Sequence, residues 1–257
     1  MAKALGTAIM APRGSNRGEV VDMQVIGHRG SAETAPENTL LGVKTALAAG
    51  APWVEIDVRH VAGELFVIHD QEVDRTTNGK GSIYALSRTE ILNLDAGEGE
   101  VIPTLQQVLG LLAGQASINI ELKDTQSMQP TCRYVATLLS EQPEWLGKIM
   151  ISTFEASIHD ELAKLLPRGC LLGVLFKQLP ANVAQYAIRL NAYSINLSFA
   201  QLTPDLVSQA QRADLKVFVY TVNEAEEIRY CLNLGVDAIY TDDPRKTLTL
   251  LDKSNIG

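Results

Sequence analysis

Short runs of β-branched and apolar residues alternate along the chain with longer stretches rich in alanine and leucine. The short runs predict strands at residues 24–27, 53–57, 117–121, 148–151, 171–174, 193–196, 216–219 and 237–240. The longer stretches predict helices, among them residues 39–49, 105–113, 158–166, 204–213 and 224–234. The chain therefore reads as a strand followed by a helix, repeated many times.

The spacing of these elements predicts a closed barrel. The last five predicted strands begin 21 to 23 residues apart, which is the span of one strand plus one helix. Eight such units form a (β/α)8 TIM barrel, and a length of 257 residues suits that α/β fold. A doubly wound sheet is the alternative, but no Gly-x-Gly-x-x-Gly turn follows the first predicted strand.

One interval is longer than the others. Between the second and third predicted barrel strands lie a further short strand at residues 65–68 and then a stretch rich in Gly, Asp and Thr. We interpret residues 71–100 as a small insertion after the second strand, lying over one end of the barrel. Residues 1–22 are predicted to be a flexible N-terminal extension, and residues 23–257 a single domain.

Composition and charge narrow the class of protein. A net charge of −8 argues against nucleic acid or an anionic membrane as partner. The three cysteines are too few and too scattered for a disulfide framework, and no segment near the start has the length of an export signal. The charge-free residues 101–120 contain one Pro, three Gln and one Asn, so we read them as a helix and a strand. A cytoplasmic location is expected.

Two predicted strands carry acidic side chains where a barrel has its active site. Glu55 and Asp57 are two residues apart in a strand, so both carboxylates point to one face near its carboxyl end. Glu121 shares a face with Asn119 and Lys123 in the next barrel strand. The alternative without a function is that Glu55 and Asp57 face the surface and that Glu121 only forms an ion pair with Lys123. The all-oxygen set favours Mg²⁺ or Ca²⁺, with Lys123 as a phosphate or oxyanion ligand.

Histidine is rare, and two of the four histidines stand where a predicted strand runs into a loop. His28 follows the first strand and His69 follows residues 65–68. A lone histidine is more often structural than catalytic. Two beside a carboxylate cluster can divide the acid and base roles of catalysis. We interpret His60, in a turn, and His159, in a helix, as surface residues.

Short motifs follow one another along most of the chain. The first motifs are HRG at residues 28–30, PENT at 36–39, EIDV at 55–58, HD at 69–70, RTT at 75–77 and GKG at 79–81. The later ones are IPTL at residues 102–105, NIELK at 119–123, STF at 152–154, YTVN at 220–223 and GVDAIYTD at 235–242. Each motif alone is weak, but together they extend from about residue 25 to residue 244. In this order and spacing they resemble the glycerophosphodiester phosphodiesterase family, of bacterial cytoplasmic type.

The resemblance implies a TIM barrel that holds one divalent cation through Glu55, Asp57 and Glu121. It also implies that His28 and His69 act as general acid and base, and that Arg29 and Lys123 hold the phosphate. Tyr220 stands where the family often has tryptophan, so an aromatic wall for the glycerol or alcohol group is expected there. The PENT motif is expected to be a helix start, with Asn38 or Thr39 as the cap and with Glu37 in a secondary role, holding Arg29.

The expected function is metal-dependent hydrolysis of glycerophosphodiesters, such as glycerophosphocholine or glycerophosphoethanolamine, to sn-glycerol 3-phosphate and an alcohol. A lysophospholipase D or a phospholipase C-like enzyme on the same barrel is an alternative, but the sequence has no amphipathic basic helix that would reach lipid. A non-catalytic phosphate-binding barrel is a second alternative, although binding alone does not need two histidines. Which histidine is the acid stays open, as do the cation, the preferred alcohol and the nucleophile, which is either water or the glycerol hydroxyl.

Overall fold

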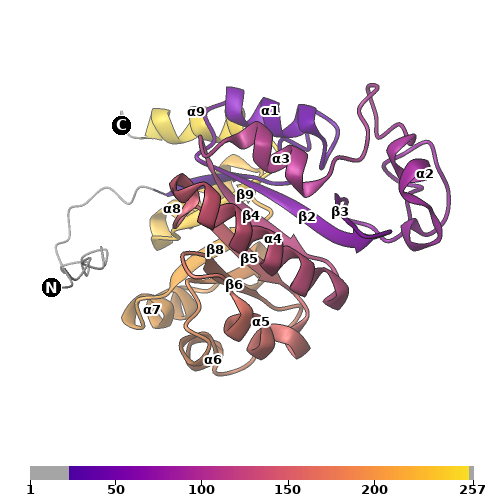
Figure 1. Cartoon of the computed structure of the whole chain (residues 1–257). Coiled ribbons are helices and arrows are strands. Elements are labelled where there is room, and N and C mark those ends of the chain that lie inside the picture. The colour runs from indigo at the N-terminus through magenta and orange to yellow at the C-terminus, as the bar shows by residue number, and fades with distance from the viewer. Residues whose placement is uncertain (1–22, 255–257) are drawn as a thin grey trace, which may run out of the picture.

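The computed structural model describes residues 23–254, which form a closed parallel barrel surrounded by helices (Figure 1). The barrel strands are β1 (Gln24–Gly27), β2 (Trp53–Val61), β4 (Ser117–Leu122), β5 (Ile149–Thr153), β6 (Leu171–Leu175), β7 (Ser194–Ser198), β8 (Lys216–Tyr220) and β9 (Ala238–Thr241). Pairing of β1 with both β2 and β9 closes the ring. The predicted (β/α)8 TIM barrel is confirmed; the predicted extension at residues 1–22 lies outside the described residues.

Helices follow the strands and cover the outside of the barrel. They are α1 (Leu40–Ala48), α3 (Leu105–Leu112), α4 (Met128–Glu141), α5 (His159–Leu165), α6 (Val183–Arg189), α7 (Pro204–Arg212), α8 (Ala225–Leu234) and α9 (Pro244–Ser254). The charge-free stretch near residues 101–120 is indeed a helix and a strand, α3 and β4. Within residues 23–254, none of the helices combines the length and the apolarity that crossing a bilayer requires.

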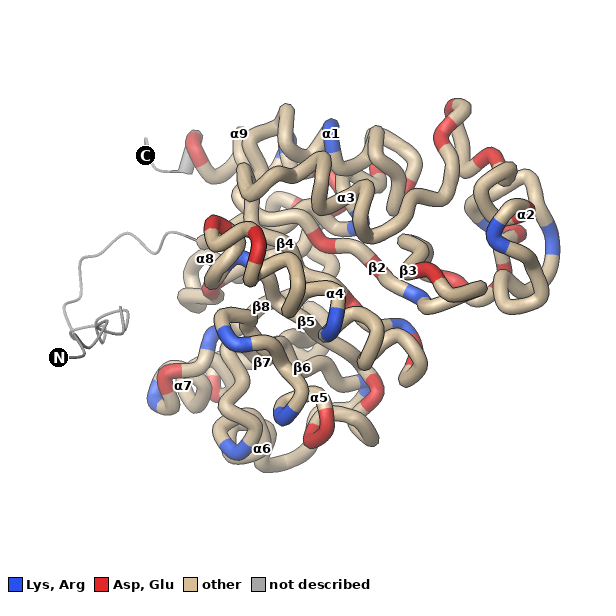
Figure 2. Tube along the Cα trace, in the orientation of Figure 1, with Lys and Arg blue, Asp and Glu red and all other residues tan. Residues whose placement is uncertain are grey.

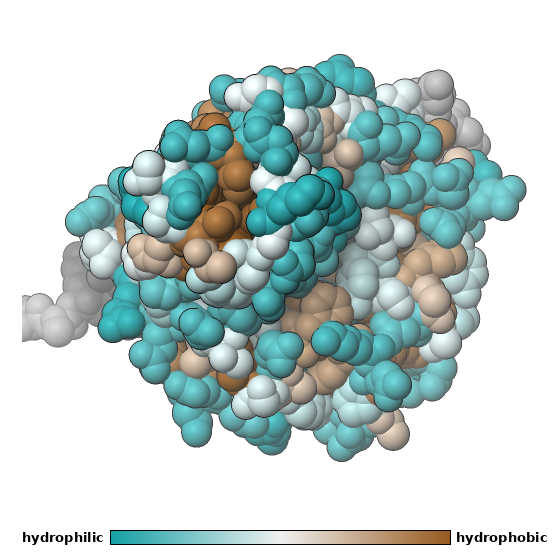
Figure 3. Space-filling view, turned by 90° about the vertical axis from the view of Figure 1, so that its right-hand side faces the viewer, coloured by the Kyte–Doolittle hydropathy of each residue, from teal (hydrophilic) through white to brown (hydrophobic). Residues whose placement is uncertain are grey.

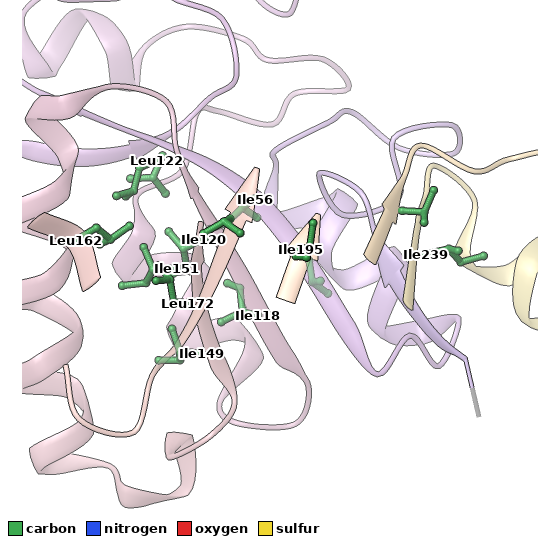
Figure 4. Close-up of a cluster of buried hydrophobic side chains, with 14 of the residues drawn as sticks. Ile56, Ile118, Ile120, Leu122, Ile149, Ile151, Leu162, Leu172, Ile195 and Ile239 are labelled. Atoms are coloured by element: carbon green, nitrogen blue, oxygen red, sulfur yellow. The ribbon is translucent and has the colours of Figure 1, made fainter. Parts of the chain in front are cut away.

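Strand alternation separates an outer core from the barrel interior. Ile56, Ile120 and Ile151 point outward into the main core between strands and helices (Figure 4). Met150 and Phe218, one residue out of phase with the outward set, belong to a second cluster inside the barrel. In the β2–β4 register Glu55 pairs with Asn119 and Asp57 with Glu121. Since side chains alternate at a period of two, these polar residues share the inward face.

The insertion lies beside the carboxyl end of β2. β3 (Glu64–Val67) pairs antiparallel with the last residues of β2, and the chain then forms a short 3₁₀ turn (Ile83–Ala85) and α2 (Arg88–Leu92) before α3 begins. Figure 1 shows this segment projecting from the barrel around α2, and Figure 2 shows that it carries both basic and acidic residues. Val73, Ile83 and Ile91 bury their side chains in a small cluster, separate from the main core, together with Val61 of β2 and Phe66 of β3. The predicted insertion is confirmed.

Two histidines lie elsewhere than their local sequence indicated. Pairing with β3 extends β2 to Val61, so His60 is a half-buried strand residue and not part of a turn. His159 begins α5 and is fully buried, so its interpretation as a surface residue was wrong. Its Nε2 donates to the carbonyl oxygen of Thr153 at 3.0 Å, and Tyr186 Oη lies 3.1 Å from its Nδ1. Hydrogen bonds on both ring nitrogens allow this imidazole to be buried.

Candidate active site

The barrel opens at the carboxyl ends of its strands into a pocket with about 550 Å³ of empty space. All of the predicted site residues except Asp57 line it, together with Asn119, Phe154, Leu175, Thr221 and Tyr240. Asp57 is buried behind them. The strand ends therefore bring together residues that are distant in the sequence, as in other (β/α)8 barrels. Figure 3 views the side of the molecule that lies on the right in Figure 1, where hydrophobic residues appear as separate patches among hydrophilic ones.

The three predicted carboxylates form one buried cluster. Glu55, Asp57 and Glu121 each offer an oxygen, and these oxygens all lie within 4.8 Å of one another. Burial and the charge of Asp57 raise the pKa of Glu55 to about 8, and the same two effects raise the pKa of Glu121. For Asp57, burial is outweighed by Lys123 and Arg29, which lower its pKa below the ordinary value. Burial and the charge of Asp57 thus disfavour full ionisation of all three carboxylates.

This cluster fits a hard divalent cation. Its donors are all carboxylate oxygens, which suit Mg²⁺ or Ca²⁺ better than zinc or copper. The raised pKa values of Glu55 and Glu121 reflect burial first and the charge of Asp57 second, and a cation at this point would offset both effects. The cluster is the only group of this kind among the described residues 23–254. A metal site is therefore supported by the donor chemistry as well as by proximity.

Two cations border the carboxylates. Lys123 Nζ lies 2.6 Å from Glu121 Oε1 and 3.3 Å from Asp57 Oδ1. Arg29 has a positive φ of 50°, and its backbone N–H donates to Glu55 Oε2 at 2.8 Å. Its Nη1 donates to Glu37 Oε1 at 2.8 Å, so the suggested contact of Glu37 with Arg29 is present. Both cations line the pocket, where they can contact an anionic ligand.

Each of the two site histidines is bonded to an aspartate. Nδ1 of His28 donates to Asp242 Oδ1 at 2.7 Å, and Nδ1 of His69 donates to Asp70 Oδ1 at 2.6 Å. Nε2 is therefore the free nitrogen of each ring for proton transfer. Burial lowers the pKa of His28, but the bond to Asp242 together with the charges of Glu55 and Asp242 outweighs it, and the net shift is upward. Burial lowers the pKa of His69, and the net shift there is downward.

Backbone and side-chain contacts hold both pairs in place. Asn223 Nδ2 donates to Asp242 Oδ2 at 2.7 Å, while Asn223 Oδ1 accepts from the Asp242 backbone N–H at 2.9 Å. Arg59 Nη2 donates to the carbonyl oxygen of His69 at 2.7 Å. These contacts hold Asp242 beside His28 and fix the backbone at His69.

An aromatic wall completes the pocket. Tyr220 packs edge to face against Phe154 and Tyr240, with ring centroids 5.7 Å and 6.3 Å apart. Lys123 Nζ lies 5.9 Å from the centre of the Phe154 ring. Burial and then the charge of Glu121 raise the pKa of Tyr220 to about 12, so its hydroxyl stays protonated. The expected aromatic side at Tyr220 is present, and Phe154 extends it.

Several supporting residues were absent from the predicted site. The sequence motifs include Asp242, Asn223 and Phe154, but no function was predicted for these three residues. Each stands at or just beyond the carboxyl end of a barrel strand, and that position was the available signal. Asn38 does not cap α1: its Nδ2 donates to Asp57 Oδ2 at 2.8 Å, and Thr39 is the cap.

Comparison with known proteins identifies the family. The profile of the Glycerophosphoryl diester phosphodiesterase family matches residues 28–246. A glycerophosphodiester phosphodiesterase of Caldanaerobacter subterraneus is 33% identical over 238 residues, covering 89% of this chain and 98% of that protein. One from Bacillus altitudinis is 33% identical over 246 residues, covering 90% of this chain and 98% of that protein.

Solved structures agree with the sequence relatives. A phosphodiesterase of Oleispira antarctica, in complex with the product sn-glycerol-3-phosphate, superposes with a TM-score of 0.80 at 30% identity, covering 89% of this chain and 96% of that one. A glycerophosphodiester phosphodiesterase of Agrobacterium tumefaciens superposes at 0.75 with 29% identity over 88% and 99% of the two chains. The fold, the family resemblance and the prediction of a phosphoric diester hydrolase are thereby confirmed. The chain belongs to the glycerophosphoryl diester phosphodiesterase family.

Proposed function

We propose that this enzyme hydrolyses water-soluble glycerophosphodiesters, such as glycerophosphocholine and glycerophosphoethanolamine, to sn-glycerol 3-phosphate and the free alcohol. The observation that carries the proposal is the presence of two histidine–aspartate pairs in one pocket with the buried carboxylate cluster. The product named for the Oleispira antarctica neighbour supports the same product here.

We propose that Glu55, Asp57 and Glu121 hold one divalent cation, Mg²⁺ or Ca²⁺. When bound, it would supply positive charge to the phosphoryl oxygens of the substrate. Arg29 and Lys123 add cationic donors on the same pocket wall, and the planar guanidinium of Arg29 can hold two oxygens at once. Charge on the phosphodiester is thus neutralised where more charge develops in the transition state.

His28 and His69 divide the proton transfers. One imidazole, neutral at Nε2, takes the proton of the attacking hydroxyl, which belongs to water or to the glycerol group of the substrate; in the second case a cyclic phosphate forms first, and a water molecule must then open it to give sn-glycerol 3-phosphate. The other, protonated, gives a proton to the departing alkoxide. Because the two tasks need opposite protonation states, activity should follow a bell-shaped pH profile. We place the glycerol or alcohol group against Tyr220 and Phe154, which form the aromatic wall.

The first test is release of sn-glycerol 3-phosphate from glycerophosphocholine. We expect turnover with Mg²⁺ or Ca²⁺ and its loss on addition of EDTA. If the protein binds the diester but leaves it chemically unchanged with every divalent cation, it is a non-catalytic binding barrel. Activity on long-chain lysophospholipid without activity on the water-soluble diester would identify a lysophospholipase D-like enzyme.

The two-histidine mechanism has its own test. His28→Ala and His69→Ala should each lower kcat by about a hundredfold or more, the usual contribution of acid–base catalysis. His60→Ala is the matched control, because His60 is a half-buried histidine of β2 that does not line the pocket. A full rate in either site variant would remove that histidine from the mechanism.

We further propose a small-molecule substrate as the partner, with no nucleic acid and no stable membrane association, and a cytoplasmic location. The acidic net charge and the free state of all three cysteines support these proposals.

A further inference from the structure

Arg75 is the insertion residue with the most direct connection to the catalytic groups. It lies between β3 and α2, and its side chain is about half exposed and does not line the catalytic pocket. Nonetheless all three guanidinium nitrogens contact carboxylates outside residues 71–100. Nη1 and Nη2 donate to Glu37 Oε2 and Oε1 at 2.7 and 2.8 Å, and Nε donates to Asp70 Oδ2 at 2.5 Å.

Both carboxylates contact a residue of the proposed mechanism through a second interaction. Glu37 Oε1 also accepts from Arg29 Nη1 at 2.8 Å. Asp70 Oδ1 accepts from His69 Nδ1 at 2.6 Å. The guanidinium of Arg75 therefore bridges the partner of the phosphate-holding arginine and the partner of one catalytic histidine. Planar, bidentate contacts of this type fix orientation as well as charge.

We propose that Arg75 is a positioning residue, through which the insertion orients Arg29 by way of Glu37 and His69 by way of Asp70. This inference rests on the proposed roles of Arg29 and His69. It assigns the insertion a part in catalysis, although no atom of Arg75 reaches the reacting groups. Without Arg75, Glu37 and Asp70 would lose the hydrogen bonds that they accept from its guanidinium group. Each carboxylate could then rotate away from the residue that it holds, which is Arg29 for Glu37 and His69 for Asp70.

Another arginine of the insertion provides a matched control. Arg88 begins α2, and its Nε donates to Glu64 Oε2 of β3 at 3.2 Å. Its side chain is 55% exposed, compared with 48% for Arg75. Arg88 thus also joins the insertion to the rest of the fold through an acidic residue, but it has no contact with the site. A loss seen with Arg75 and not with Arg88 separates positioning from general attachment of the insertion.

The test compares Arg75→Gln with Arg88→Gln in steady-state assays on glycerophosphocholine at saturating cation. Arg75→Gln should lower kcat by about 10- to 100-fold, the scale on which supporting partners of site ligands act. It should also raise KM, because Arg29 loses its orientation toward the phosphate. Arg88→Gln should keep both constants within about twofold, since exposed ion pairs contribute little. Arg75→Lys should recover only part of the loss, because an ammonium group cannot serve both carboxylates.

A double-mutant cycle tests the route of the effect. If Arg75 acts on His69 through Asp70, kcat of Arg75→Gln combined with Asp70→Asn should be no lower than kcat of Asp70→Asn alone. In the same way Glu37→Gln should reproduce the rise in KM, and adding Arg75→Gln to it should raise KM no further. Thermal unfolding of each variant shows that the comparison concerns folded protein, and Arg75→Lys serves if the glutamine variant does not fold.

Three results would overturn the inference: unchanged kcat and KM in Arg75→Gln, an equal loss in Arg88→Gln, or full additivity with Asp70→Asn. Failure of the proposed function would look different, since the wild-type enzyme would then not turn over glycerophosphocholine, or His69→Ala would retain the full rate.

Discussion

His28 and His69 are supported by the same device, an aspartate on Nδ1. Asp242, just after β9, accepts from His28 at the end of β1, while Asp70 accepts from His69, the residue next to it in the chain. The aspartate fixes the tautomer of the neutral ring, with the proton on Nδ1 and Nε2 as the acceptor. The net pKa shifts are nevertheless opposite, upward for His28 and downward for His69, because burial prevails only in the second case.

Asp242→Asn should reveal which role His28 has. The hydrogen bond to Asp242 raises the pKa of His28, so its loss should lower that pKa. One limb of the pH profile of kcat/KM should then move toward lower pH. If His28 is the acid, the alkaline limb moves; if it is the base, the acid limb moves. A profile with both limbs in place would show that Asp242 does not act on a catalytic group.

A fully buried His159 should make stability depend on pH. Burial lowers the pKa of His159 below 6.5, so the unfolded chain takes up a proton more readily than the folded one. The free energy of unfolding should therefore fall as the pH drops below about 6.5. Urea unfolding at about pH 7 and pH 5 should show a smaller pH effect in His159→Gln than in the wild type. An equal pH effect in both proteins would contradict this.

At the scale of the elements, three consecutive residues of the loop before α1 contact the site residues or cap the helix. Glu37 binds Arg29 and Arg75, Asn38 holds Asp57, and Thr39 caps α1 through the bond that its hydroxyl accepts from Gly42 N–H at 3.1 Å. One short segment therefore connects a helix start to the floor of the site.

Thr39→Ala should lower the free energy of unfolding by about 1 to 2 kcal/mol, the usual cost of losing an N-cap. The loss should lie toward the upper end because Thr39 is fully buried and its hydroxyl also donates to the Pro36 carbonyl oxygen at 2.7 Å. Thr249→Ala, at an exposed position of α9, should stay within about 0.5 kcal/mol. Equal effects of the two substitutions in urea unfolding would refute the role of the cap.

Over the whole molecule, the net charge of −8 includes a buried acidic cluster, which Lys123 and Arg29 neutralise in part. This acidic protein can bind an anionic substrate because Arg29, Lys123 and the proposed ion place positive charge in the pocket. Figure 2 shows basic and acidic residues interspersed along the described part of the chain.

Cation binding should accordingly stabilise the folded state. At a concentration of about 100 times its Kd, a bound ion adds about 2.7 kcal/mol, which raises Tm by roughly 5 to 10 °C for a chain of this size. EDTA should reverse the gain, and Glu121→Gln, which removes a ligand charge while keeping the side-chain shape, should abolish most of it. A Tm indifferent to Mg²⁺ and Ca²⁺ would refute the cation site.

The sequence by itself determined the architecture and most of the candidate site. Alternation at a period of two placed Glu55, Asp57 and Glu121 on inward faces, and the regular strand spacing predicted the barrel; both are local properties of the chain. Only the tertiary structure decided which side chains meet across the closed ring. Asp242 reaches His28 across 214 residues, Arg75 joins Glu37 to Asp70, and His159 is buried. Such contacts depend on barrel closure and on loop conformation, and neither leaves a periodic signal in the sequence.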